Sequence, residues 1–307
     1  MPDAAVARAS RRSQARAPAR APAAPAAAAA AAARKRVAPK ASPPKASPPS
    51  KKQKANDSWV SPIIDAGGSK RTGSFKALVS STKPPHTLLL GTQPSNVSLA
   101  HGWYFGRDEN AFWHIVGCAL GFRRGFHVNQ RSDGDVVPCV AKYLPPGLTV
   151  VPTYKEAVDR LQDAGYALWD VLESSERKSA KSAKKTSMDA DIKDGKPAPI
   201  EAFVDAYPSV RRLVFVTGSG SAKIFQKHFA EWLASDRTRF VTGNAKAAAV
   251  FGAHKKYPIP SREDAGAGIA IELIVPPSVS PAAARFDGDF GDKKDNWLKD
   301  VFTTGFV

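Results

Sequence analysis

Three short segments of this 307-residue chain contain residues able to bind and activate a ligand, and each follows an apolar run. The first, residues 91–113, reads GTQPSNVSLAHGWYFGRDENAFW. The second, residues 217–222, reads TGSGSA, and the third, residues 275–282, reads VPPSVSPA. Amides such as those of Gln93 and Asn110 can orient a water molecule, and glycines let a backbone approach a ligand closely. These residue types predict a site built from loops.

Each of these features also has a structural interpretation. Gly218 and Gly220 resemble part of a phosphate cradle, but they lack the full GxGxxG spacing and the Lys of a P-loop, which favours tight strand-to-helix packing. Asn110 precedes an apolar helical pattern, as helix N-cap residues do. The aromatic residues between 103 and 113 suit a core as well as a base-stacking surface. Asp170, at a predicted strand end, is either a general base or a cap.

From about Trp59 onward, apolar runs alternate with helix-like segments, and this alternation predicts an α/β fold with a parallel sheet. Open sheets of this kind bind ligands at the carboxyl ends of their strands. We therefore expect the three segments to contribute to one site. The predicted strands cover residues 87–90, 166–171, 213–217 and 269–275, and the predicted helices cover residues 110–120, 154–164, 222–233 and 296–301.

Residues 1–55 consist mainly of Ala, Pro, Arg, Lys and Ser, and they carry thirteen Lys and Arg against the single Asp3. They therefore supply +12 of the net charge of +17. Without aromatic residues such a segment buries too little apolar surface to fold, so we expect a disordered basic tail. Its basic clusters are interpreted as a nuclear localisation signal. The alternatives are an organelle transit peptide (mitochondrion or plastid), a DNA tether or a plain linker. Residues 56–307 are expected to form one domain, with a mobile charged insertion near 178–196.

The cysteine, histidine and apolar content of the chain argues against disulfide-rich, metal-binding and membrane-spanning proteins. Two cysteines, Cys118 and Cys139, are too few for a disulfide framework or a four-thiolate cluster, which favours a reducing compartment. The six His residues are scattered, so no metal site is predicted. The chain has no run of about 18 strongly apolar residues, and we expect no membrane span.

Four strings, in order along the chain, carry a resemblance to a known family. GTQPSNVSLAHGWYFGRDENAFW resembles the first signature of the hypoxanthine-DNA glycosylases within the uracil-DNA glycosylase superfamily, and VPPSVSPAA resembles the second. Between them lie GYALWDVLESSERK and YPSVRRLVFVTGSGSAKIF. The resemblance spans about Leu88 to Val301. It implies a three-layer αβα fold with a mainly parallel four-stranded sheet, a base-excision repair activity on damaged DNA, no cofactor, and a monomer.

The resemblance also assigns roles to residues. Asn110 matches the Asn that orients the attacking water, with Gln93 as a secondary candidate. The Pro277–Ser280 loop offers backbone N–H groups and hydroxyls to DNA phosphates, with Val279 as a small wedge and Arg285 as a further phosphate contact. Tyr104 or Phe105 is expected to stack on the extruded base. The base pocket is assigned to Gly91, Pro94, Ser95, Tyr104, Phe105 and Phe112, and the DNA contacts to Ser278, Val279, Ser280 and Arg285.

Three positions depart from the other branches of the superfamily. Gln93 stands where those branches place a catalytic Asp or Asn, Pro276 where uracil-specific relatives have His, and Thr217 where an Asn is common. The last two departures favour hypoxanthine over uracil. No Lys lies in either signature loop, which favours attack by water over attack by an enzyme amine. The alternatives are a uracil or mismatch glycosylase of the same fold and an inactive DNA-damage-binding module.

Overall fold

The computed structural model describes residues 60–64, 71–125, 147–177, 192–254, 256–264, 266, 268–283 and 289–302. The tail, Cys139 and Arg285 lie outside the described residues, and the expectations for them stay predictions. The charged insertion expected over 178–196 is described only from Ile192 onward.

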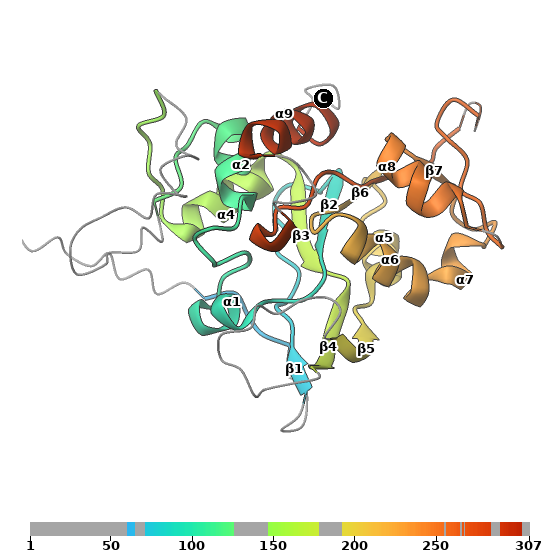
Figure 1. The fold of residues 1–307 in the computed structure, drawn as a ribbon, viewed down its shortest axis with the longest axis horizontal. Coiled ribbons are helices and arrows are strands. Elements are labelled where there is room, and N and C mark those ends of the chain that lie inside the picture. Colours follow the sequence, from blue (N-terminus) through green and yellow to red (C-terminus); the bar gives the residue numbers. More distant parts are fainter. Residues whose placement is uncertain are drawn as a thin grey trace, which may run out of the picture. The chain divides into compact units, whose positions relative to one another are not determined.

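A five-stranded parallel sheet forms the centre of the fold, where Figure 1 labels β2, β3 and β6. Its strands follow the order β3-β2-β6-β8-β7. Four of these strands coincide with the predicted ones, and the expected four-stranded sheet gains a short fifth strand, β7. Its three residues are too few to show a periodic pattern. The strands are β2 (Thr87–Gly91), β3 (Tyr166–Asp170), β6 (Arg212–Phe215), β7 (Phe240–Thr242) and β8 (Ile271–Ile274).

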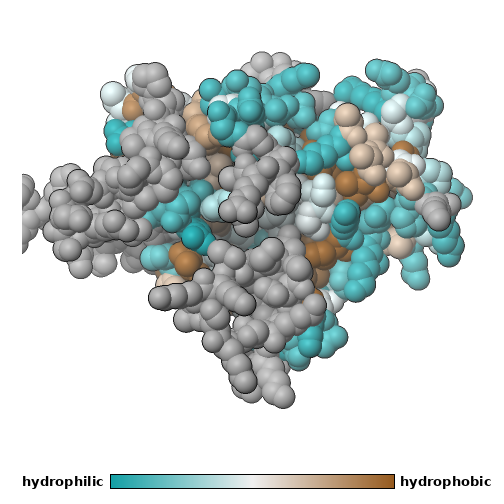
Figure 2. All heavy atoms as spheres, viewed as in Figure 1, coloured by the Kyte–Doolittle hydropathy of each residue, from teal (hydrophilic) through white to brown (hydrophobic). Residues whose placement is uncertain are grey.

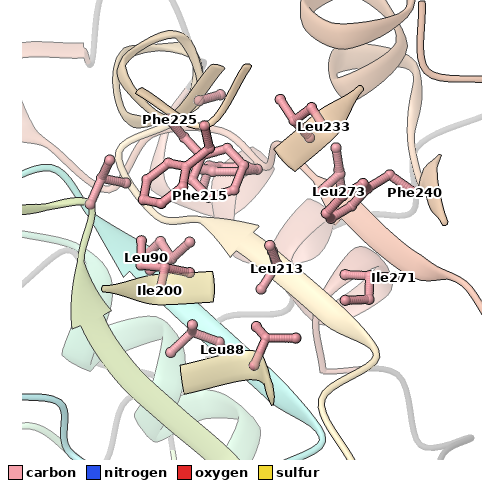
Figure 3. Packing of buried hydrophobic residues seen from close by; sticks show 14 of the residues in the cluster. Leu88, Leu90, Ile200, Leu213, Phe215, Phe225, Leu233, Phe240, Ile271 and Leu273 are labelled. Atoms are coloured by element: carbon pink, nitrogen blue, oxygen red, sulfur yellow. The ribbon is translucent and has the colours of Figure 1, made fainter. Parts of the chain in front are cut away.

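Helices cover both faces of the sheet, which gives the three-layer α/β architecture expected from the sequence (Figure 1). Successive strand residues point to opposite faces. Leu88 and Leu90 therefore pack into one core cluster and Leu89 into the other. The cluster of Leu88 also contains residues of α5 (Ile200–Ala206), α6 (Ser219–His228) and α7 (Ala230–Leu233) (Figure 3). The cluster of Leu89 contains residues of α2 (Phe112–Leu120), α4 (Tyr154–Asp163) and α9 (Phe290–Asp300).

Helix boundaries follow local chemistry. Thr153 caps α4 in a capping box with Glu156, as its Thr-x-x-Glu spacing favours. The single helix expected over 222–233 is two helices, α6 and α7, which meet at Phe229. Helix α9 begins six residues earlier than expected, where Asp289 provides the N-cap. Short helical segments complete the described part: α1 (Asn96–His101), α8 (Ala245–Ala247), a π-helical turn (Ala248–Gly252) and a 3-10 turn (Pro281–Ala283).

A second, antiparallel sheet was not expected. It has the order β1-β4-β5, with β1 (Arg71–Gly73), β4 (Leu172–Arg177) and β5 (Ile192–Pro197). The expected loop over 178–196 is thus a strand from Ile192, because IKDGKP pairs with β4 through its backbone although it has no apolar alternation. Only Val171 separates β3 from β4, so this sheet begins beside the carboxyl end of β3.

The surface shown in Figure 2 is largely hydrophilic over the described residues, with small hydrophobic areas between. Among the helices of the described residues, none is long and apolar enough to cross a membrane.

Candidate active site

The three predicted segments meet at the carboxyl edge of the parallel sheet. The hydroxyls of Thr92 and Thr217 lie 2.8 Å apart and share a hydrogen bond, which joins the first segment to the second. A β-carbon on Gly218 would lie 3.2 Å from the β-carbon of Ser278, so the second segment contacts the third. The backbone N–H of Ala111 donates to the carbonyl of Val279 at 3.0 Å and joins the third to the first.

Gly91, at the end of β2, packs closely against the Asp170 carboxylate and the Phe105 ring. It is the last residue of β2 and pairs in register with Asp170 at the end of β3. A β-carbon at Gly91 would lie 2.3 Å from the Asp170 carboxylate oxygen Oδ1 and 3.3 Å from Cζ of Phe105. Any side chain at position 91 would therefore displace one of these groups.

Substituting Gly91 with Ala tests this packing. We expect Gly91→Ala to destabilise the fold by about 1–3 kcal/mol, because the added methyl overpacks a site with no room for it. The measurement is the free energy of unfolding in urea, with Gly121→Ala for comparison. Gly121 has a positive φ of 75°, but no atom lies within 4 Å of its β-carbon position, so that variant isolates backbone strain from overpacking. A loss at Gly91 well below about 1 kcal/mol would contradict the tight fit.

Asp170 is a buried carboxylate at this edge, with 2% of its surface exposed. The Ser74 hydroxyl donates to its Oδ2 at 2.5 Å. Because β3 leads into β4 and not into a helix, Asp170 caps no helix, and its contact with Ser74 instead ties it to a neighbouring segment. Burial, together with the negative charge of Asp170, raises the pKa of Tyr104 well above its ordinary value. The carboxylate oxygens of Asp170 are acceptors of the kind that bind ring N–H groups.

Phe105 has a backbone conformation that L residues rarely adopt, with φ of 51°. Strain of this kind persists where the surrounding structure enforces it, often at functional sites. The ring lies 4.4 Å from that of Phe112, centroid to centroid. Phe112 is fully buried and Tyr104 is 2% exposed, with its hydroxyl donating to the carbonyl of Phe75, whereas Phe105 is half-buried. Of the three rings assigned to the base pocket, Phe105 is the accessible one.

Asn110 is half-buried just before α2, at the same edge of the fold. The N-cap of α2 is Ala111, but Oδ1 of Asn110 accepts the backbone N–H of Phe112 at 3.0 Å and so satisfies an N–H at the start of the helix, as a cap does. Among the described residues no protein acceptor binds its Nδ2. The geometry therefore combines the cap with an amide N–H₂ group that is left for a ligand or water.

Gln93, the secondary catalytic candidate, has both ends of its side-chain amide engaged. Its Nε2 donates to the carbonyl of Thr72 in β1 at 2.7 Å, and the hydroxyl of Ser175 in β4 donates to its Oε1. Gln93 thus ties the first segment to the antiparallel sheet. Of its two neighbours assigned to the base pocket, Pro94 is buried and Ser95 caps α1 by accepting the Ser98 N–H at 3.1 Å.

The loop of the third segment is fixed from inside the fold. Trp297 of α9 donates its indole N–H to the carbonyl of Pro277 at 2.7 Å, and the buried ammonium of Lys293 donates to the carbonyl of Ser278 at 2.9 Å. Val279 is 1% exposed and its N–H donates to the carbonyl of Val216, so the expected wedge is not displayed in this conformation. The N–H of Ser280 donates to the hydroxyl of Ser278.

Sequence reasoning missed Lys293 because it precedes the expected helix over 296–301, and it placed Trp297 in that helix without linking it to the 277–279 loop. A longer helix would have placed both, four residues apart, on one face. Within the described residues no cluster of three or more His, Cys, Asp or Glu is arranged to hold a metal ion.

No protein-family model and no curated protein matches the chain. Among solved structures, the chain is similar to a solution NMR structure of a "putative Uracil DNA glycosylase" from Methanosarcina acetivorans. The identity is 20% and the TM-score 0.41, over 76% of this chain and 96% of that one.

Proposed function

We propose that the protein is a DNA repair glycosylase, which hydrolyses the bond between a deaminated base, hypoxanthine, and its deoxyribose. The observation that carries the proposal is the meeting of Gly91, Asp170, half-exposed Phe105 and Asn110 at one edge of the sheet. Together they supply a close backbone approach, an acceptor, a stacking ring and an amide for water.

Each group has a task in this reaction. The target nucleotide has to leave the duplex, because its glycosidic bond is inaccessible inside the stack. Phe105 stacks on the extruded base. Asp170 accepts a hydrogen bond from the ring N–H that deamination creates, at N1 of hypoxanthine or N3 of uracil. Adenine and cytosine carry an acceptor at that position, and a carboxylate opposite an acceptor disfavours them.

Asn110 orients the water that attacks the sugar carbon. As the glycosidic bond breaks, positive charge develops on the sugar and negative charge on the departing base. Water adds to the sugar carbon, its proton is lost, and the base leaves with the bonding electrons and is protonated.

The preference for hypoxanthine over uracil is supported by the groups beside the pocket. Thr217 has its hydroxyl bound to Thr92, and Pro276 has no donor, so neither offers the amide or imidazole that would stabilise a departing uracil. A purine spreads the leaving charge over two fused rings and depends less on such a donor. A uracil glycosylase of the same fold is the second candidate, since Asp170 accepts the N3–H of uracil equally well.

A substrate panel tests the proposed function. We expect single-turnover release from an inosine·thymine duplex to be at least about tenfold faster than from a uracil·guanine duplex, because one missing leaving-group donor costs about 2.7–4 kcal/mol. An adenine·thymine duplex of the same sequence is the control. Faster release of uracil would assign the protein to the uracil branch, and binding of both duplexes without release of either base would indicate a damage-binding module.

A further inference from the structure

Arg124 is a buried arginine whose guanidinium binds the backbone of a neighbouring loop. It follows α2 and is 3% exposed. Nη1 donates to the carbonyl of Asp108 at 2.5 Å, and Nη2 donates to the carbonyl of Gly106 at 3.4 Å. Nη2 also lies 3.4 Å from the Asp108 carboxylate oxygen Oδ1, an ion pair shielded from water. One planar group thus holds two carbonyls and one carboxylate.

The loop that Arg124 holds connects two residues of the candidate active site. Phe105, with its strained φ of 51°, immediately precedes Gly106, and Asn110 lies two residues after Asp108. The N–H of Asn110 donates to the carbonyl of Arg107 at 3.0 Å, inside the same turn. A shift of this turn would move the stacking ring and the water-orienting amide together.

His114 of α2 completes the arrangement. Its Nε2 lies 3.3 Å from Nη1 of Arg124, and burial together with the charge of Arg124 lowers the pKa of His114 to about 3. The imidazole is therefore neutral near pH 7 and accepts from the guanidinium. Burial lowers the pKa of Arg124 only to about 10, opposed by Asp108, so the guanidinium stays protonated.

We propose that Arg124 is a positioning residue of the active site, which holds the 106–108 turn so that Phe105 and Asn110 face the same substrate. This proposal rests on the proposed glycosylase function. The guanidinium touches neither base nor sugar in this role. It acts because catalysis depends on placement to within about an ångström, and a misplacement of that size can lower a rate about 100-fold.

The chain contains a matched control in Arg212. This arginine is 4% exposed and has the same kinds of partner: the carbonyls of Val301 and Asp300 and the carboxylate of Glu272. It is the first residue of β6, so it lies at the amino edge of the sheet, opposite the site. Losing either guanidinium disrupts a comparable buried network, but only Arg124 contacts the turn that carries Phe105 and Asn110.

The experiment compares Arg124→Lys with Arg212→Lys. Lysine keeps the charge but cannot bind two carbonyls and a carboxylate in one plane. We expect Arg124→Lys to lower the single-turnover rate on inosine duplex by about 10–100-fold, with duplex affinity changed by less than about threefold. Arg212→Lys is expected to lower the unfolding midpoint while its rate stays within about twofold of the wild type. Both variants are assayed well below their unfolding midpoints.

A second measurement places Arg124→Lys in the Asn110→Ala background. If Arg124 acts through Asn110 and Phe105, the double variant loses much less than the product of the two single losses. Independent losses, an unchanged Arg124→Lys rate, or equal slowing by both arginine variants would overturn the proposal.

Hydrogen exchange of the backbone amides of residues 106–111 provides a readout that needs no activity. It is expected to accelerate in Arg124→Lys and to stay unchanged in Arg212→Lys, and equal exchange in both variants would also overturn the proposal. A wild-type protein that releases no base from any duplex would instead refute the glycosylase function, while the exchange data still decide whether Arg124 holds the turn.

Discussion

Replacement of Asn110 with Ala is expected to lower the single-turnover rate of base release by about 10²–10⁴-fold while the variant still binds duplex DNA. In the proposed mechanism its Nδ2 group, which has no acceptor among the described residues, holds the attacking water. The measurement is the rate of hypoxanthine release at saturating enzyme, together with duplex affinity from a separate titration.

The capping contact of Asn110 requires its own control, because Oδ1 also accepts the N–H of Phe112 at 3.0 Å. Losing a cap costs about 1 kcal/mol. Asn110→Ser keeps an acceptor for the cap but has no amide to place the water. We expect Asn110→Ser to be nearly as stable as the wild type and nearly as slow as Asn110→Ala. Wild-type rates in the serine variant would limit Asn110 to capping α2.

Acidification from pH 6.5 to pH 3 is expected to remove about 4–5 kcal/mol of folding free energy through His114 alone. The folded protein keeps this imidazole neutral because burial and Arg124 lower its pKa from 6.5 to about 3. The unfolded chain takes up a proton below pH 6.5, whereas the folded chain does not until about pH 3. Unfolding is therefore favoured progressively across that window. Such a loss is a large part of ordinary domain stability.

His114→Gln isolates this effect. The Gln side chain can still accept from the Arg124 guanidinium, as Nε2 of His114 does, but it does not titrate. Urea denaturation between pH 7 and pH 4 should show the wild type losing up to about 1.4 kcal/mol per pH unit more than the variant. The other histidines with lowered pKa values, His86, His101 and His228, are common to both proteins and cancel. Parallel pH profiles would mean that His114 is protonated in the folded state.

The parallel sheet was predictable because its strands are buried on both sides and read as apolar runs such as Leu88–Leu90. The antiparallel sheet was not, since β4 and β5 contain Ser, Glu, Lys and Asp and are formed through backbone pairing. The break between α6 and α7 at Phe229 was likewise not predictable from the sequence, because an apolar residue at that position fits one continuous helix as well as two.

The meeting of the three segments followed from the rule that parallel strands end at a shared edge. Individual roles were harder to predict. The side-chain bonds of Gln93 to Thr72 and Ser175 depend on the unexpected sheet. The burial of Val279 follows from its two backbone bonds to Val216 and Ala111, which no local pattern shows. Arg124 lies just after α2, outside both signatures, and its side-chain bonds back to the 106–108 turn are not visible in any sequence pattern.

The spread of the site along the chain affects its formation during synthesis. Strand β2 pairs with β3 and β6, more than 70 and 120 residues further on, and the 277–279 loop is held by Lys293 and Trp297 of α9. Contacts of such sequence separation form late in folding. A nascent chain that has emerged only as far as β8 contains every assigned base-pocket residue but not the helix that fixes the last loop. If the protein is the proposed glycosylase, we therefore expect base release to begin only once α9 has left the ribosome and docked.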